Sequence, residues 1–153
     1  MKTMQQWFDD YSVSHQNETN QKIHFICVPA IFFSIVGMLL SIPIDRSKVI
    51  KIFDNPMIEN WATFALFLVL AFYFNKSFRV FLKMLVFSTF CLVANYYLSH
   101  VVPILPVSLG IFILAWIGQF YGHKIEGKKP SFFKDLQFLL IGPAWVFEKL
   151  IKK

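Results

Sequence analysis

Long apolar runs alternate with short charged segments along this chain. Residues 23–44, 60–75 and 84–123 contain no Asp, Glu, Lys or Arg. One helical crossing of a bilayer needs about 20 apolar residues. The first run is long enough for one span, the second is slightly short, and the third suits two spans joined by a turn at His100 to Pro106. The pattern therefore predicts an all-α, polytopic membrane protein with about four transmembrane helices.

The two ends of the chain carry shorter apolar patterns. Over residues 1–14 the apolar side chains recur at helical spacing, which predicts an amphipathic helix at the membrane interface. An uncharged stretch near the other end, residues 136–147, is interrupted by Gly142-Pro143 and is too short for a fifth span. We expect this stretch to form an interfacial or re-entrant helix. Pro29, early in the first long run, either kinks that helix or marks its start.

The composition supports a lipid environment. The 153 residues are 56% hydrophobic, 18% aromatic and 16% charged, whereas about a quarter of the residues of a soluble domain are charged. The 19 Phe residues exceed what one small water-soluble core can bury. Without an internal repeat or linker, residues 1–153 are expected to form a single integral membrane domain. The net charge of +6 comes from lysines beside the apolar segments, which favours anionic membrane lipid over nucleic acid as a partner.

Four spans would place both termini on the same side of the membrane. The N-terminal segment, the loop after the second span and the C-terminal segment hold most of the 15 Lys and Arg residues. The exceptions are Arg46, Lys48 and Lys51, in the loop after the first span. Because cytoplasmic loops are enriched in Lys and Arg, both termini are predicted to be cytoplasmic. A bacterial inner membrane is the expected location.

The four histidines divide between the two sides of such a bundle. His15, His24 and His123 fall at the cytoplasmic boundary of the predicted spans. His100 falls in the turn on the opposite side. One site can therefore gather three of the histidines, but not all four.

Convergence of His15 and His24 requires a break between them. On one continuous helix the nine intervening steps would turn the two side chains to opposite faces. Asn17 or Thr19 is a suitable N-cap for a new helix at this point. Asn20 and His24 would then share one face of that helix, at positions i and i+4.

A second group of polar residues lies near the end of the last long run. Its members are spaced three, four and three residues apart, which places them on one helix face: Trp116, Gln119, His123 and Glu126. Gly118 and Gly122 form a GxxxG motif beside this stripe, and such a motif lets another helix approach closely. The motif can act within one chain or between chains, so the oligomeric state stays open.

These residue types suit a metal site. Neutral imidazole is a good ligand for Fe, Zn or Cu, and two or three histidines with open coordination positions suit iron-dependent oxygen chemistry. Glu126 would either bind the metal or orient a ligand histidine, and Asn20 and Gln119 are candidates for outer contacts or an extra ligand. The alternative is structural, because interfacial histidines often bond lipid headgroups or cap helices. His100 is assigned to that alternative.

Three motifs carry a resemblance to a known membrane family. The first is Tyr11-x3-His15-x-Asn17-x2-Asn20-x2-Ile23-His24-x2-Cys27-x-Pro29. The second is Trp116-x2-Gln119-Phe120-x-Gly122-His123-x2-Glu126-Gly127-x2-Pro130. The third is Leu140-x2-Pro143-x4-Glu148. Over nearly its whole length the chain resembles a bacterial member of the 2-hydroxy fatty acid dioxygenase family, whose fungal enzyme is named for metabolism of phytosphingosine to odd-numbered fatty acids.

The resemblance implies an Fe(II)-dependent dioxygenase, a non-haem iron oxidoreductase of lipid and fatty acid metabolism. Such an enzyme uses O2 for α-oxidation of a 2-hydroxy fatty acid, cleaving the C1–C2 bond and shortening the chain by one carbon. The family's essential histidines match His15, His24 and His123, which would serve as catalytic residues and Fe2+ ligands. The substrate's carboxylate and 2-hydroxyl would chelate the iron, and the acyl chain would lie between the membrane helices.

Two other classes of function compete with this interpretation. A non-enzymatic small membrane protein, such as a transporter or an assembly factor, is one, although transporters typically place ionisable groups near the bilayer midplane. A zinc-dependent lipid hydrolase is the other, and it would need Glu126 as its general base. Lys124, Lys128 or Lys129 would attract a substrate carboxylate in the dioxygenase, although a solvated basic face is the simpler role for them.

Overall fold

The computed structural model describes residues 2–44, 54–127 and 138–151. Within these ranges the chain forms six α-helices and no strand. The helices are α1 (Met4–Ser12), α2 (Glu18–Leu40), α3 (Trp61–Lys76), α4 (Phe78–Leu98), α5 (Ile104–Ile125) and α7 (Ile141–Ile151). The predicted all-α fold is confirmed.

Three of the helices, α2, α4 and α5, are long and apolar enough to cross a membrane. The 16-residue helix α3 is shorter but also apolar, in keeping with the short second run of the sequence. Large apolar side chains project outward from these helices, and more than half of the surface of Phe67, Val86, Phe90 and Leu114 is exposed. Such a surface is stable in lipid rather than in water, as expected of a polytopic membrane protein.

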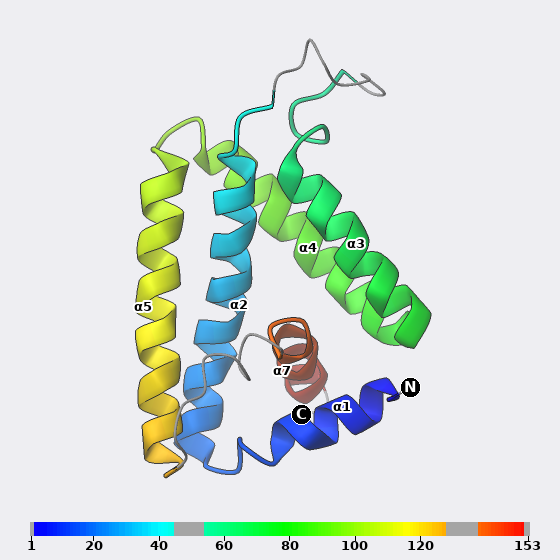
Figure 1. Ribbon diagram of the computed structural model, residues 1–153, viewed down its shortest axis with the longest axis vertical. Helices are drawn as coiled ribbons and strands as arrows, with labels where there is room; N and C mark the ends of the chain where they lie inside the picture. The colour runs from blue at the N-terminus through cyan, green and yellow to red at the C-terminus, as the bar shows by residue number, and fades with distance from the viewer. Residues whose placement is uncertain (1, 45–53, 128–137, 152–153) are drawn as a thin grey trace.

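The helices form two pairs and a cap (Figure 1). α2 and α5 run antiparallel and side by side, and this contact is the most extensive one between any two helices of the described chain. α3 and α4 form a second antiparallel pair that is tilted away from the first. α1 and α7 lie across the end of the bundle where α2 begins and α5 ends, and both marked termini lie at this end.

α2 starts at the break predicted between His15 and His24. The helix begins at Glu18, before the apolar run, and continues without a break through Pro29. The polar first turn is helical because the Asn17 side chain accepts hydrogen bonds from the backbone N–H groups of Thr19 and Asn20, at 2.9 and 3.2 Å. Proline is tolerated inside membrane helices because neighbouring groups satisfy the freed carbonyl. The interpretation of Pro29 as a helix start was wrong.

The long apolar run divides into α4 and α5 as predicted, with shifted boundaries. α4 begins at Phe78, ahead of the uncharged run, and includes Lys83, whose ammonium forms a 2.6 Å ion pair with Glu148 of α7. The turn between the helices is shorter than predicted, because Pro103 is the N-cap of α5. Pro106 therefore lies in the first turn of α5, where proline leaves no hydrogen bond unmade.

The C-terminal helix α7 is too short to span a bilayer, in line with the prediction of an interfacial or re-entrant helix. It begins at Ile141, so Gly142 and Pro143 belong to its first turn and do not interrupt it. Residues 136–137 of the predicted stretch lie outside the described residues. The first half of α7 is buried against α1, α2 and α4, which makes this helix part of the core.

Candidate metal centre

His15, His24 and His123 meet at the capped end of the bundle. His15 follows α1, His24 lies in the second turn of α2, and His123 lies near the end of α5. The ring centroids are 4.3 Å apart for His15 and His24, 4.9 Å for His24 and His123, and 5.3 Å for His15 and His123. One ligand nitrogen from each ring lies within 4.8 Å of the other two. All three side chains are buried, with at most 4% of their surface exposed.

The segment between α1 and α2 lets His15 face His24. α1 ends at Ser12, and Asn17 caps α2, so the chain turns at the predicted break. The Gln21 side chain donates a 2.7 Å hydrogen bond to the His15 carbonyl oxygen, which ties this turn to α2. Of the two caps considered, Asn17 is the one that the chain uses.

Backbone carbonyls orient two of the three rings. The Nδ1 atom of His15 lies 2.7 Å from the Tyr11 carbonyl oxygen, and Nδ1 of His24 lies 2.9 Å from the Asn20 carbonyl oxygen. A carbonyl only accepts, so each Nδ1 carries the proton and donates it, and Nε2 keeps its lone pair. The buried Nε2 of His15 has no hydrogen-bond partner among the described residues. Metal-binding histidines have this arrangement.

Burial also sets the charge of His15. It lowers the pKa of this ring from 6.5 to about 4, and the neighbouring His123 acts in the same direction. The hydrogen bond to Tyr11 opposes these effects without outweighing them. The ring is therefore neutral at pH 7, which is the state in which imidazole binds metals.

Glu126, the residue after α5, clamps the turn that carries His15. Its carboxylate accepts backbone hydrogen bonds from Gln16 at 2.8 Å and from Asn17 at 2.9 Å, and one from the Asn20 side chain at 3.0 Å. Burial raises the pKa of Glu126, but these hydrogen bonds outweigh it and the pKa is lowered. Both oxygens are engaged in this way, so Glu126 acts on His15 through the backbone.

The GxxxG motif packs α5 onto α2 within the chain. A Cβ atom on Gly122 would lie 2.3 Å from Oδ1 of Asn20, and one on Gly118 would lie 2.6 Å from Sγ of Cys27. Both contacts are closer than real Cβ atoms allow. Because glycine has no side chain, α5 approaches α2 closely at these two positions, and His123 on α5 therefore lies next to His24 on α2.

Two aromatic residues that were not among the candidate site residues flank His15. The Tyr11 ring stacks on the imidazole at 4.1 Å, and the Trp145 ring of α7 lies 5.4 Å from it. Tyr11 is four residues before His15, so its place follows from helical spacing. Trp145 is distant in sequence, and no local pattern predicts its contact with His15.

The group that could hold a metal consists of the three histidines alone among the described residues. Trp116 and Gln119 are buried deeper along α5, where they line a cavity of only about 10 Å³. His100 lies at the opposite end of the bundle, with Nδ1 2.8 Å from the Tyr96 carbonyl oxygen. Lys124 is exposed at the end of α5, and residues 128–129 lie outside the described residues.

Comparison with known proteins identifies one family. Residues 1–153 match the family described as Mpo1-like: 2-hydroxy-palmitic acid dioxygenase Mpo1-like. No curated protein and no solved structure is significantly similar to the chain. The match covers the segments that carry all three buried histidines.

Proposed function

This chain belongs to the Mpo1-like family, and on that premise we propose that it is an Fe(II)-dependent dioxygenase that shortens 2-hydroxy fatty acids by α-oxidation. The observation that carries the proposal is the cluster of His15, His24 and His123, buried with their ligand nitrogens within 4.8 Å of one another. Buried polar groups are normally hydrogen-bonded, and the Nε2 atom of His15 has no such partner among the described residues. A metal ion would satisfy it.

The donor set fits iron with open positions. Three imidazole ligands suit Fe, Zn and Cu, and a site with three protein ligands would leave coordination positions open for substrate and O2. When bound, the iron would supply adjacent sites where the carboxylate and 2-hydroxyl of the substrate meet O2. A zinc hydrolase would instead need a general base, and both oxygens of Glu126, the candidate for that role, already accept hydrogen bonds.

The chain's own residues would hold the rings in place and exclude water. The carbonyls of Tyr11 and Asn20 orient His15 and His24, and Glu126 holds the turn between α1 and α2. The rings of Tyr11 and Trp145 cover His15 and shield it from water. Positioning of this kind keeps ligands in one geometry while substrate and O2 exchange.

The proposed reaction balances with O2 as the oxidant. The C1–C2 bond of the 2-hydroxy acid breaks, C2 becomes the carboxyl carbon of the shortened acid, and C1 leaves as CO2. One O2 accepts the four electrons that this oxidation releases, and one water is formed. The predicted reaction therefore consumes one O2 for each acid shortened.

The site would face the cytoplasm. The three rings lie where α2 begins and α5 ends, which is the end of the bundle that holds both marked termini (Figure 1). The distribution of Lys and Arg supports a cytoplasmic position of this end, with a bacterial inner membrane as the proposed location. A fatty acid could then present its polar head to the histidines at the interface while its chain stays in lipid.

The test begins with the metal. Protein purified anaerobically in detergent is expected to hold about one iron per chain, as a single three-histidine site would. His15→Ala, His24→Ala and His123→Ala should each lose the iron while keeping their helical content. His100→Ala is the matched control, because this ring lies at the opposite end of the bundle, and it should retain the metal.

Oxygen uptake then tests the reaction. The wild type and His100→Ala should consume O2 with 2-hydroxyhexadecanoate, and not with hexadecanoate, which lacks the second chelating oxygen. Full iron retention in all three site variants would refute the proposed ligand set. Bound zinc that is unaffected by the three substitutions would refute the dioxygenase.

A further inference from the structure

Gln119 of α5 buries a side-chain amide that has no protein partner. Only 5% of the surface of this residue is exposed, and its amide forms no hydrogen bond with another residue of the described chain. Nearly all buried polar groups in proteins are hydrogen-bonded, either to the protein or to an ordered water. The partner of this amide is therefore expected to come from outside the chain.

The Gln119 side chain lines a cavity with room for one small molecule. The cavity has a volume of about 10 Å³ and lies between α2, α5 and the start of α7. One water needs roughly this much space, together with two or more polar partners. The head of a fatty acid needs several times more room. The size of the cavity thus restricts its ligand to a molecule as small as water.

The Tyr11 side chain lines the same cavity and offers a second polar group. Its hydroxyl lies near Gly142, where an added Cβ atom would be 3.2 Å from Oη of Tyr11 and 3.2 Å from Cγ1 of Val28. A hydroxyl donates one hydrogen bond and accepts others, so it can bind a water beside its other contacts. An amide also both donates and accepts. Gln119 and Tyr11 can therefore hold one water between them.

The cavity adjoins the candidate metal centre. Gln119 is four residues before His123, which places it one helical turn deeper along the same face of α5. The Tyr11 ring stacks on the His15 ring, with 4.1 Å between their centres. A water bound in the cavity would therefore connect α5 to the ring that stacks on His15.

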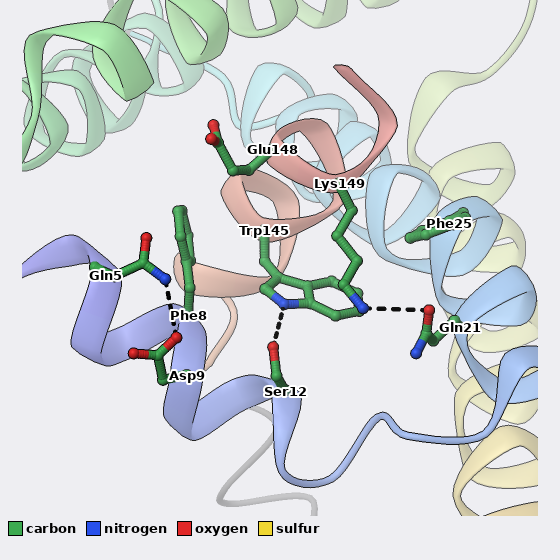
Figure 2. Close-up of a pocket in the computed structure, with 9 residues that line it drawn as sticks. All are labelled: Gln5, Phe8, Asp9, Ser12, Gln21, Phe25, Trp145, Glu148 and Lys149. Carbon is green, nitrogen blue, oxygen red and sulfur yellow. Dashed lines mark hydrogen bonds between the residues drawn. The ribbon is translucent and has the colours of Figure 1, made fainter. Parts of the chain in front are cut away.

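A larger cavity at this end of the bundle differs in its polar lining. It has a volume of about 400 Å³ and lies between α1, α2 and α7. Six of its side chains are hydrogen-bonded to one another in the pairs Gln5–Asp9, Trp145–Ser12 and Lys149–Gln21 (Figure 2). These groups already have partners within the chain, whereas the amide of Gln119 does not. The small cavity is therefore the better candidate for an ordered water.

We propose that the cavity between α2, α5 and α7 binds one ordered water, held by the Gln119 amide and the Tyr11 hydroxyl. The water links α5 to α1 beside the candidate metal centre. Gln119 is then a positioning residue, which acts on His15 through the water and the Tyr11 ring. This last step rests on the proposed function, since it concerns the metal.

NMR spectroscopy of the full chain, metal-free and in detergent micelles, tests the water itself. The probe is the solvent water, and the signal is a cross-relaxation peak between water and the side-chain amide protons of Gln119. Gln119→Leu assigns these protons by their disappearance. The wild type should show a peak of dipolar sign, because a bound water lies within hydrogen-bond distance of the amide. Amide protons that merely exchange with solvent give the opposite sign.

Filling the cavity should remove the peak while Gln119 stays in place. Gly142→Ala adds a methyl group between Tyr11 and Val28, and Val28→Ile adds one from α2 without changing α7. Gly110→Ala is the matched control, with no atom within 4 Å of the new Cβ, and it should keep the peak. A wild type without the peak would overturn the proposal, and so would a peak that persists in both filled variants.

Metal affinity tests the positioning role. Gln119→Leu is expected to weaken Fe2+ binding about 10-fold, at the lower end of the losses found for residues that orient ligands. Competition with a chelator measures the affinity. Gln5→Leu makes the same substitution at an exposed position of α1 and should leave the affinity unchanged. Wild-type affinity in Gln119→Leu would overturn the positioning role.

A double variant separates this role from a purely structural one. Gln119→Leu and Gly142→Ala would act through the same water, so their combined loss of metal affinity should not exceed the larger single loss. Additive losses would mean that the two residues act independently and would overturn the link through water.

Failure of this proposal and failure of the dioxygenase give different results. The water peak is measured without metal, so it is present even if the protein holds no iron. If the water proposal fails, the peak is missing, but the three histidine variants still lose the iron that the wild type holds.

Discussion

Two buried polar clusters lie along the same helices, and only one of them has the donor set of a metal site. The first is the histidine cluster, with Asn20 of α2 packed against Gly122 of α5. The second, here called the crossing cluster, consists of Gly37 on α2, Asn95 on α4 and Ser108 on α5. A Cβ atom on Gly37 would lie 2.1 Å from Oγ of Ser108 and 2.5 Å from Oδ1 of Asn95.

A glycine allows close helix packing in both clusters, but the two clusters bury different atoms. In both, a glycine lets a polar side chain of another helix reach the backbone. The Asn95 amide donates to the carbonyl oxygens of Phe33 and Cys91, at 3.1 and 2.9 Å, and so ties α4 to α2. Its neighbours are a hydroxyl and a glycine, which are poor ligands for transition metals. Burial and close packing are therefore common to both clusters, and imidazole nitrogen is what distinguishes the first.

Removing one polar side chain from each cluster should give the largest contrast. His24→Ala is expected to lose iron and more than about 100-fold of activity, since changes outside the ligand set already cause 10- to 100-fold losses. Asn95→Ala should keep the iron and lose only stability. Iron analysis and O2 uptake on the two variants measure this difference. Equal iron content in both would remove the distinction between the clusters.

Glu126→Gln tests the clamp on the His15 turn. The side-chain nitrogen of glutamine donates hydrogen bonds and cannot accept them. In Glu126→Gln this nitrogen would therefore oppose one or more of the N–H groups of Gln16, Asn17 and Asn20. Metal affinity should fall about 10- to 100-fold, as it does for other residues that orient ligands. Competition with a chelator measures the affinity. Glu18→Gln, an exposed change in the first turn of α2, is the control, and an effect of equal size there would contradict a specific role for Glu126.

Adding one methyl group to each glycine separates packing from chemistry. Gly122→Ala and Gly37→Ala are each expected to lower the free energy of unfolding by about 1–3 kcal/mol, because both sites are already filled. Only Gly122→Ala should also weaken metal binding, since the new methyl would lie 3.4 Å from Cε1 of His24. Thermal unfolding in detergent measures the stability. Gly110→Ala is the matched control, with no atom within 4 Å of the new Cβ, and a comparable loss there would rule out crowding as the cause.

The smallest effect is expected from Ser108→Ala. Its buried Oγ has no hydrogen-bond partner among the described residues, so removing it leaves no new unpaired group. The free energy of unfolding should change by less than about 1 kcal/mol, within the range found for polar contacts in membrane helices. A change in metal content of Ser108→Ala would mean that the two clusters are coupled through α5.

The sequence by itself determined the membrane fold and the side on which each histidine lies. A helix enters a bilayer because of its own apolar length, so the runs identify the three helices that are long enough to cross a membrane, and α3 as a shorter apolar helix. The number of crossings then separates His100 from the other three rings. The break at Asn17 and the spacing of His123 and Glu126 are also local, since capping and helical period act over a few residues.

Only the tertiary structure decided what surrounds the rings. Lys149 of α7 meets Gln21 of α2, and Trp145 of α7 meets His15, each across more than a hundred residues, and no periodicity connects them. The same holds for Glu126, whose partners lie in the turn between α1 and α2. Helix boundaries follow local hydropathy and capping, which act within a few residues. Contacts between α1, α2 and α7 form only when the whole chain packs, so the order of residues does not reveal them.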